Sequence, residues 1–361
     1  MSISPFMTPD QSRRRRDASR RRRRRRRAVI AGVFAVVIIG ALVVMALAKS
    51  HTKSDSAAAS THAARTGQPV RPQLSQIGLP LSKPALPLAG IATPQLDALH
   101  TTFQTPPRAG LLFNVSTGQV LWQRNPYRRV RIASLTKMMT ALLTVQAAPP
   151  DAPVLVTRQA VEAAGSKVGV LPLGRHVRLE TMLYGLLLPS GNDAAMALAQ
   201  HVAGTAGRFV ARMNAEAAKL GMGCTRYSSP SGYVNEGNYS CAADLAVLAH
   251  VDLEQPRIAS IVRTYTAVLP FPIQGGKLYL YNNNPLLIYG YPGVTGLKTG
   301  FTEAAGKCLV ATAERHGVRL GVVLLHSPDP GTQAAYLLNR GFEGVYHQAP
   351  VPQVPPIPPD A

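Results

Sequence analysis

The sequence is poor in the residues that most often hold metals or build aromatic cores. Its 361 residues include three cysteines and nine histidines, with no C-x-x-C pair and no H-E-x-x-H or similar grouping. We therefore predict neither a metal site nor a cofactor. Aromatic residues make up 6% of the chain, so its core must be mostly aliphatic.

Acidic residues are also scarce, at 18 against 39 basic residues, which gives a net charge of +21. Such an excess would indicate nucleic-acid binding if it were spread over a folded domain. Residues 1–53 alone carry +12, including eight consecutive arginines at Arg20–Arg27, and the rest carries +9 without a dense block. We predict no nucleic-acid partner, and a DNA-binding arm remains an alternative only for the arginine run.

The longest uncharged stretch is Ala28–Ala48, directly after those arginines. Its 21 residues can span a bilayer at about 20 residues per span. Positive residues stay on the cytoplasmic side, so the pattern predicts an inside segment 1–27, a single transmembrane helix and an outside remainder. Ala46-Leu47-Ala48 also fits a signal-peptide cleavage site, although the apolar stretch exceeds the roughly 7–15 residues of a signal core. Secretion after cleavage near Ala48 is therefore the alternative.

The rest of the chain divides by composition. Residues 49–106 are rich in Ala, Ser, Thr, Pro and Gln and predict a flexible linker, and residues 347–361 form a Pro-rich tail. Between them, residues 107–346 form the predicted domain. Strand-like runs lie at both of its ends, with a hairpin at Ser116-Thr117-Gly118 and a turn at His316-Gly317, and helical patterns lie in the middle. That order predicts an α/β (α+β) domain with one sheet built from both ends.

The cysteines leave two alternatives open. Cys224 and Cys241 flank a loop rich in Ser, Gly and Asn and could form a disulfide in an exported domain, but three reduced thiols fit equally well. Cys308 lies in a strand-like run and is predicted to be buried and unreactive.

One pair of residues requires a chemical explanation. Ser134 and Lys137 lie three apart at the head of an apolar helical segment, where they share one face. A serine hydroxyl needs a base to become a nucleophile. A lysine can be that base only if burial or a nearby cation lowers its pKa. Alone, the pair is equally consistent with a helix-start serine and a surface lysine.

Two further motifs follow in the chain. Ser190-Gly191-Asn192 interrupts two helical patterns and, alone, could be a helix cap. Lys298-Thr299-Gly300 lies in a strand-like run with glycines on both sides, which often marks the close approach of a ligand or backbone.

In this order, S-x-x-K, S-G-N and K-T-G resemble the motif set of penicillin-binding proteins and serine β-lactamases. The sequence is most similar to the low-molecular-mass D-alanyl-D-alanine carboxypeptidases, also in "NAEAAKLGM", "SSPSGY" and "GVTGLKTGFTEAAG", and over residues 107–342. The resemblance implies a β-lactamase/transpeptidase-like fold, with an antiparallel sheet flanked by helices and a helical subdomain. It also implies removal of the terminal D-alanine from peptidoglycan stem peptides, with β-lactams as acylating inhibitors.

The resemblance assigns chemical roles to the first two motifs. Ser134 would be the acylated nucleophile, and Lys137 would accept its proton. Ser190 would relay protons between the lysines and the leaving group. Asn192 would orient both the substrate amide and Lys137.

The third motif is implied to bind the substrate. Lys298 and Thr299 would hold the terminal carboxylate, and Gly300 would leave space for it on the strand edge. The backbone N–H groups of Ser134 and Phe301 would form the oxyanion hole.

Two departures from the family pattern stand out. Thr295 takes the place of a frequent Asp before the third motif, and "SPDPGTQAAYLL" lacks an Arg that helps many members to bind the carboxylate. A β-lactamase remains an alternative, although the sequence has no E-x-x-x-N element between Asn192 and Gly232. A non-catalytic penicillin-binding wall protein is the other alternative, although every motif residue is intact.

Overall fold

The structure is a computed structural model that describes residues 74–91, 99, 101–233 and 236–351. The chain divides into two units, Met1–Arg65 and Thr66–Ala361, and every described residue belongs to the second. The Arg-rich segment, the predicted span Ala28–Ala48 and residues 352–361 of the tail lie outside the described residues. Within the described part of the chain, no helix is long and apolar enough to cross a membrane.

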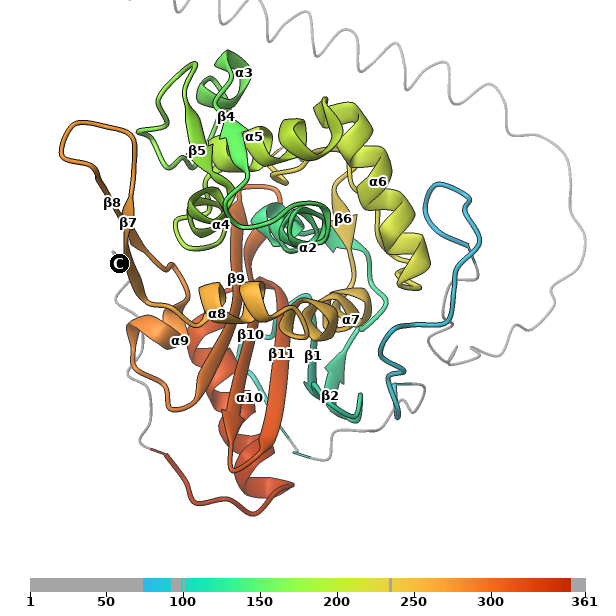
Figure 1. The fold of residues 1–361 in the computed structure, drawn as a ribbon. Helices are drawn as coiled ribbons and strands as arrows, with labels where there is room; N and C mark the ends of the chain where they lie inside the picture. The colour runs from blue at the N-terminus through green and yellow to red at the C-terminus, as the bar shows by residue number, and fades with distance from the viewer. Residues whose placement is uncertain (1–73, 92–98, 100, 234–235, 352–361) are drawn as a thin grey trace, which may run out of the picture. The chain divides into compact units, whose positions relative to one another are not determined.

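A five-stranded antiparallel sheet is built from both ends of the domain, as the sequence predicts, in the order β2-β1-β11-β10-β9 (Figure 1). Its register places Leu111, Val323, Val310 and Lys298 in one row across four strands. The edge strand β9 thus carries Lys298 at the open side of the sheet. The strands are β1 (Ala109–Asn114), β2 (Val120–Arg124), β9 (Val294–Thr302), β10 (Gly306–Arg315) and β11 (Val318–Ser327).

Both faces of this sheet are covered, which explains why its strands are apolar runs rather than alternating patterns. On β11, Val322 belongs to one buried cluster together with Leu338 of the final helix α10 (Pro330–Gly344). The next residue, Val323, belongs to the opposite cluster, which includes Leu248 of α7 (Ala242–Leu253). Consecutive side chains therefore enter two separate cores.

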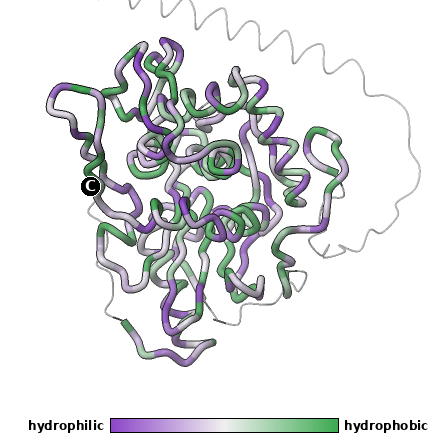
Figure 2. The backbone as a smooth tube through the Cα atoms, viewed as in Figure 1, coloured by the Kyte–Doolittle hydropathy of each residue, from purple (hydrophilic) through white to green (hydrophobic). Residues whose placement is uncertain are grey.

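The helical insertion between β2 and β9 confirms the predicted order of elements. In α6, Phe209, Met213 and Ala217 are buried four positions apart, on one face of the helix. The colour along this helix alternates between hydrophilic and hydrophobic (Figure 2). The other helices are η1 (Ala133–Thr136), α2 (Lys137–Ala147), α3 (Arg158–Val161), α4 (Leu179–Leu187), α5 (Asn192–Ala203), α6 (Ala206–Lys219), α8 (Pro256–Val262) and α9 (Pro285–Ile288).

Three small antiparallel ribbons complete the fold. They pair β3 (Val130–Arg131) with β6 (Tyr239–Ser240), β4 (Pro153–Leu155) with β5 (His176–Arg178), and β7 (Thr266–Pro270) with β8 (Lys277–Tyr281).

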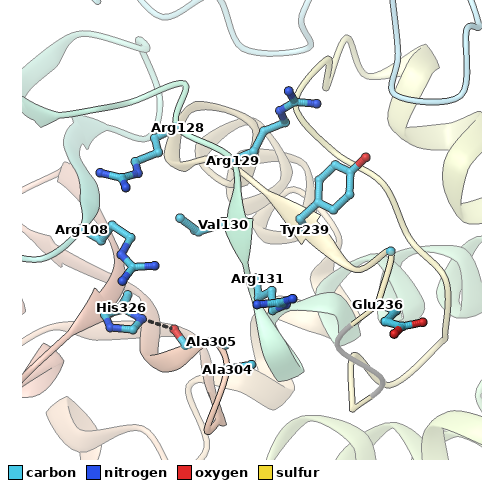
Figure 3. A pocket seen from close by; sticks show the side chains of 11 residues that line it. Arg108, Arg128, Arg129, Val130, Arg131, Glu236, Tyr239, Ala304, Ala305 and His326 are labelled. Carbon is cyan, nitrogen blue, oxygen red and sulfur yellow. Dashed lines mark hydrogen bonds between the residues drawn. The ribbon is translucent and has the colours of Figure 1, made fainter. Parts of the chain in front are cut away.

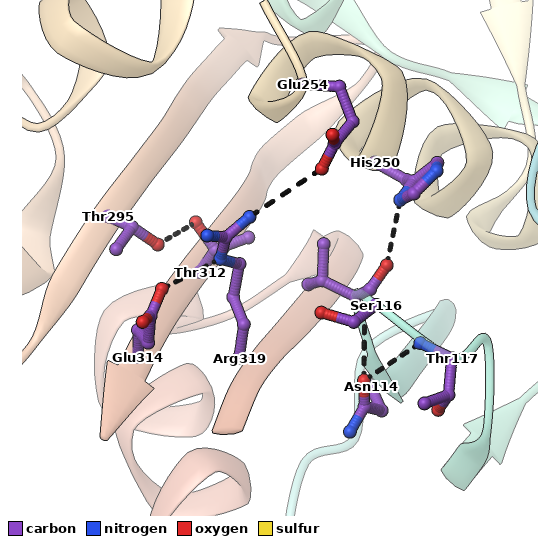
Figure 4. A network of polar contacts seen from close by, with 10 residues as sticks. Asn114, Ser116, Thr117, His250, Glu254, Thr295, Thr312, Glu314 and Arg319 are labelled. Atoms are coloured by element: carbon purple, nitrogen blue, oxygen red, sulfur yellow. Dashed lines mark hydrogen bonds and ion pairs between the residues drawn. The ribbon is translucent and has the colours of Figure 1, made fainter. Parts of the chain in front are cut away.

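Polar contacts join the end of α7 to the sheet (Figure 4). Arg319 on β11 lies 3.0 Å from Glu314 of β10 and 3.9 Å from Glu254, the C-terminal capping residue of α7. One turn earlier, the Nδ1 of His250 lies 2.9 Å from the carbonyl oxygen of Val115. Because these ion pairs are partly solvated, they position α7 more than they stabilise the fold.

The described part of the predicted linker differs from the sequence-based expectation. Residues 74–91 lie against the domain, where the backbone N–H of Ala89 donates to Gly118 and that of Val120 donates to Ala89. The side chain of Leu86 is only 3% exposed. Its apolar burial and these backbone bonds hold the segment, although its Pro-rich composition is typical of a flexible linker.

The cysteines resolve into one disulfide and one thiol. Cys224 and Cys241 are bonded, with their Cα atoms 5.7 Å apart. Cys308 is free and buried, and burial raises the pKa of its thiol to about 11. This thiol is therefore protonated and unreactive at neutral pH, as the sequence predicts.

Candidate active site

Ser134 and Lys137 meet at the junction of two helical segments. Ser134 lies in the 3-10 turn η1, and Lys137 is the first residue of α2. The Nζ of Lys137 lies 2.9 Å from the Oγ of Ser134. The lysine side chain is 0% exposed, whereas the serine is half-buried and lines a cleft. The structure therefore brings the predicted pair together with only the serine accessible.

The other contacts of Lys137 decide which way its lone pair points. Its Nζ donates to the Oδ1 of Asn192 at 2.6 Å and to the carbonyl oxygen of Ser231 at 3.0 Å. Both oxygens can only accept, so they take the two N–H bonds of a neutral amine. The remaining direction faces the Oγ of Ser134. A neutral Lys137 thus presents its lone pair to the serine hydroxyl.

Electrostatics favours that neutral form. Burial lowers the pKa of Lys137 well below its ordinary value, and the positive charge of Lys298 lowers it further. The carboxylate of Asp193 acts in the opposite direction but contributes less. Burial also lowers the pKa of Lys298, to about 7. Lys137 is therefore suited to act as a base, and Lys298 is suited to act as a cation that titrates near neutrality.

Ser190 occupies the break between α4 and α5. Its φ of +67° is in the left-handed region, which costs a non-glycine residue free energy and is common at functional sites. Its buried Oγ has no hydrogen-bond partner among the described residues, and the residue lines the same cleft as Ser134. A hydrogen bond from Ser190 to Lys137 or Lys298 is not formed in this structure.

The second motif is held in place by residues that the sequence reasoning did not select. Asn192 donates from Nδ2 to the carbonyl oxygen of Ala164 at 2.6 Å, which orients its Oδ1 towards Lys137. The carboxylate of Asp193 accepts from the backbone N–H groups of Val168 at 2.9 Å and Gly169 at 3.0 Å. The sequence signal for Asp193 is its position directly after S-G-N, where an Asp is common at the start of a helix.

The loop around Ser231 also holds the site, although that reasoning assigned it no role. Gly232 has a φ of +75°, and a Cβ at this position would lie 1.9 Å from the carbonyl oxygen of Ala133. Only glycine lets the loop pack this closely on the turn that carries Ser134. The S-P-S-G-Y stretch, which is rich in turn residues, is the signal for it in the sequence.

The third motif lies along the edge strand β9. Lys298 is 1% exposed, and its Nζ donates to the carbonyl oxygen of Thr299 at 3.1 Å. A Cβ on Gly300 would lie 2.8 Å from the carbonyl oxygen of Ile132 and 3.1 Å from the backbone nitrogen of Ser134. Glycine at this position thus allows β9 to approach the turn that carries the nucleophile.

The three motifs converge on one cleft of about 380 Å³, hereafter the active-site cleft. Motif residues from all three line it, namely Ser134, Ser190, Thr299 and Gly300, together with Phe301. Phe301 is 59% exposed. Lys137, Asn192 and Lys298 lie behind this lining, in the buried layer described above.

The two departures from the family pattern also have a structural setting. The Oγ1 of Thr295 hydrogen-bonds the Oγ1 of Thr312 on β10 at 2.8 Å, so this position serves the sheet (Figure 4). Where the family often has an Arg, Asp329 and Pro330 line the cleft instead. Lys307, which pairs with Phe301 across the ladder, is an additional cation that lines this cleft.

Comparison with known proteins agrees with this geometry. The profile of the family described as D-alanyl-D-alanine carboxypeptidase matches residues 100–329. The chain is 34% identical over 243 residues to D-alanyl-D-alanine carboxypeptidase DacF of Bacillus subtilis, which covers 65% of this chain and 62% of that protein. It is 36% identical to the carboxypeptidase DacB2 of Mycobacterium tuberculosis, over 66% of this chain and 82% of that one. The chain thus spans less than two thirds of the length of DacF.

Solved structures show the same relationship. The D-alanyl-D-alanine carboxypeptidase of Mycobacterium tuberculosis superimposes with a TM-score of 0.63 at 31% identity, over 71% of this chain and 97% of that one. The DD-transpeptidase of Streptomyces K15 gives 0.62 at 30% identity, over 67% and 99%. The predicted α/β transpeptidase-like fold is therefore confirmed for the described domain, and this chain belongs to the D-alanyl-D-alanine carboxypeptidase family of serine peptidases.

Proposed function

We propose that this protein is a serine-type D-alanyl-D-alanine carboxypeptidase that removes the terminal D-alanine from peptidoglycan pentapeptides. The observation that carries the proposal is a buried Lys137 with both N–H bonds taken by carbonyl oxygens and its third direction on Ser134. When neutral, such an amine can accept the serine proton. β-Lactams acylate the same Oγ because they present a strained amide to it.

Acylation proceeds in two proton transfers. Lys137 takes the proton of Ser134 as the Oγ bonds to the carbonyl carbon of the penultimate D-alanine. The oxyanion that forms accepts hydrogen bonds from the backbone N–H groups of Ser134 and Phe301. The peptide C–N bond then breaks, and the leaving amine receives the proton from Lys137 through Ser190. The Oγ of Ser190 has no hydrogen-bond partner among the described residues, so it is available to bridge Lys137 and the leaving amine once substrate is bound.

Deacylation repeats the steps with water as the nucleophile. Lys137, neutral again, takes a proton from water, whose oxygen attacks the ester carbon. The ester C–O bond breaks, and the proton returns to the Oγ of Ser134. The products are a peptide shortened by one residue and the free enzyme.

Selectivity for a free carboxylate end comes from β9. Lys298 supplies a buried positive charge, and Thr299 supplies a hydroxyl donor at the cleft. Asn192 orients Lys137 through its Oδ1, and the same side chain would orient the substrate amide. A cross-linked peptide without a free end leaves this charge unpaired, which is unfavourable in a buried site.

The test is the release of D-alanine from diacetyl-L-lysyl-D-alanyl-D-alanine by the full chain. The wild type should turn over repeatedly, whereas the Ser134→Ala variant should release none and carry no fluorescent penicillin, with an unchanged circular dichroism spectrum. Stoichiometric penicillin labelling without D-alanine release would favour a non-catalytic penicillin-binding protein instead. Sustained nitrocefin hydrolysis would favour a β-lactamase.

We further infer that Ala28–Ala48 anchors the chain in the cell membrane, with the catalytic domain, residues 107–346, outside. The eight arginines before an uncharged stretch of 21 residues support this topology, and the Cys224–Cys241 disulfide supports an oxidising compartment. Protein in the membrane fraction that is degraded by external protease would agree. Mature protein in the medium beginning at Lys49 would show that the segment is a cleaved signal.

A further inference from the structure

A second cavity, of about 570 Å³, lies beside the active-site cleft. Four arginines line it, and Figure 3 shows Arg108 beside His326, with Arg129 and Tyr239 on another side of the opening. We call it the arginine cavity, after Arg108, Arg128, Arg129 and Arg131.

The arginine cavity and the active-site cleft share a wall. Ala304 and Ala305, in the turn between β9 and β10, line the cavity, whereas Phe301 and Cys308 on those strands line the cleft. The Sγ of Cys308 lies 4.0 Å from the carbonyl oxygen of Arg131. A ligand that leaves the cleft along β9 therefore passes over the β9–β10 turn to the cavity.

Among the described residues, positive charge outweighs negative charge in the lining of the cavity. Its lining contains a single carboxylate, that of Glu236. Within the described residues, none of the four guanidinium groups lies within 4.0 Å of a carboxylate, although Arg257 pairs with Glu180 at 2.8 Å elsewhere. Guanidinium groups bind carboxylates and phosphates strongly because their planar donors match two oxygens.

The arginines differ in how they are held. Arg129 donates to the Oε1 of Gln76 and lies over the ring of Tyr239, 5.9 Å from its centroid. The guanidinium groups of Arg108 and Arg128 form no hydrogen bond with the residues that the structure describes. Arg129 is therefore pre-positioned, whereas Arg108 and Arg128 have N–H donors available for a ligand. Pre-positioning lowers the entropic cost of binding.

The direction of the substrate follows from the proposed function. With the terminal carboxylate at Thr299 and the scissile carbonyl at the Phe301 N–H, the peptide runs antiparallel to β9, and its upstream residues lie towards Ala304. An extended chain advances about 3.3 Å per residue. Ala304 lies three residues beyond Phe301, so a side group two or three residues upstream of the scissile bond reaches the cavity.

We propose that the arginine cavity binds a carboxylate of the acidic stem peptide upstream of its D-alanyl-D-alanine end. The proposal rests on the proposed function, since that function sets the direction of the peptide. It makes an acidic peptide, rather than any peptide ending in D-alanyl-D-alanine, the preferred substrate.

The test compares two pentapeptides that differ in one charge. Both read acetyl-L-alanyl-γ-D-X-L-lysyl-D-alanyl-D-alanine, where X is glutamate with a free α-carboxylate or its α-amide. The wild type should show about a tenfold higher kcat/KM for the acid, as expected for one charge-assisted contact. Arg108→Gln/Arg128→Gln should reduce that ratio towards 1 without changing turnover of the amide or labelling by penicillin.

The matched control is Arg208→Gln, which removes an exposed arginine on α6, away from both cavities. It should keep the wild-type ratio. Equal kcat/KM for the two peptides in the wild type, or an unchanged ratio in the double variant, would overturn the proposal.

Failure of the proposed function has a different signature, in which neither peptide is hydrolysed. The affinities of the two peptides for the Ser134→Ala variant, measured by fluorescence anisotropy, then test the cavity by themselves. Equal affinities would overturn the proposal. Poly(glycerol phosphate) that binds the wild type but not the double variant, together with equal peptide affinities, would assign the cavity to a phosphate polymer instead.

Discussion

The Nζ of Lys137 lies 2.9 Å from the Oγ of Ser134, across the boundary between a 3-10 turn and an α-helix. The lysine is fully buried, whereas the serine lines the cleft. Base and nucleophile are thus in contact before any substrate is present. The rate should therefore depend on the charge state of Lys137 more than on a rearrangement.

The first prediction is a bell-shaped pH profile of kcat/KM for a peptide with a free carboxylate end. Lys137 acts only when neutral, so activity falls as the pH falls through its lowered pKa. Lys298 acts only when charged, so activity falls as the pH rises through its pKa of about 7. Because kcat/KM reports ionisation of the free enzyme, both limbs reflect the two lysines before substrate binds. Initial rates of D-alanine release measure the profile.

One variant tests the two limbs of the pH profile separately. Lys298→Arg keeps a positive charge at all accessible pH values, so the alkaline limb should move upward while the acidic limb stays in place. An alkaline limb that remains near pH 7 in this variant would show that another group causes it.

The second prediction distinguishes recognition from chemistry on β9. Thr299→Val removes one hydrogen bond to a carboxylate, worth about 1.5–3 kcal/mol, and should lower kcat/KM about 10–150-fold. Lys298→Ala should lower it further, because it also removes the charge that helps to keep Lys137 neutral. Steady-state kinetics of both variants decides this. Near-normal turnover by Lys298→Ala would make this lysine an ordinary strand residue.

The third prediction concerns Lys307, a cation that lines the cleft of this chain, which lacks the arginine found in many family members. Lys307→Gln should raise KM for a free carboxylate end about two- to fivefold, because an exposed ion pair contributes little. Its kcat should be unchanged. Lys277→Gln, on the exposed ribbon strand β8, is the matched control. Identical KM values for the two variants would exclude a role for Lys307.

The fourth prediction concerns the disulfide. Cys224 and Cys241 are 17 residues apart and enclose the loop whose Ser231 carbonyl holds Lys137. Cys224→Ala/Cys241→Ala should lower the free energy of unfolding by about 3 kcal/mol, because the unfolded chain gains freedom. Urea denaturation measures it. Dithiothreitol should destabilise the wild type and leave the double variant unaffected, and equal stabilities without reductant would contradict the prediction.

The sequence alone determined the parts that depend on local order. Apolar periodicity and turn residues predicted the β1–β2 hairpin, the helical middle of the domain and the β10–β11 turn. The order of three short motifs predicted the family and the residues Ser134, Ser190 and Thr299 that line one cleft. These signals are readable because each depends on residues only a few positions apart.

Only the tertiary structure decided the environment of these residues. The contact from Lys137 to Ser231 joins residues 94 positions apart, and the row from Leu111 to Lys298 crosses four strands. The packing of residues 74–91 and the arginine cavity likewise depend on distant segments. Burial and charge proximity set the pKa of a lysine, and both are properties of the packed chain, because sequence spacing does not record which distant groups exclude water from one another.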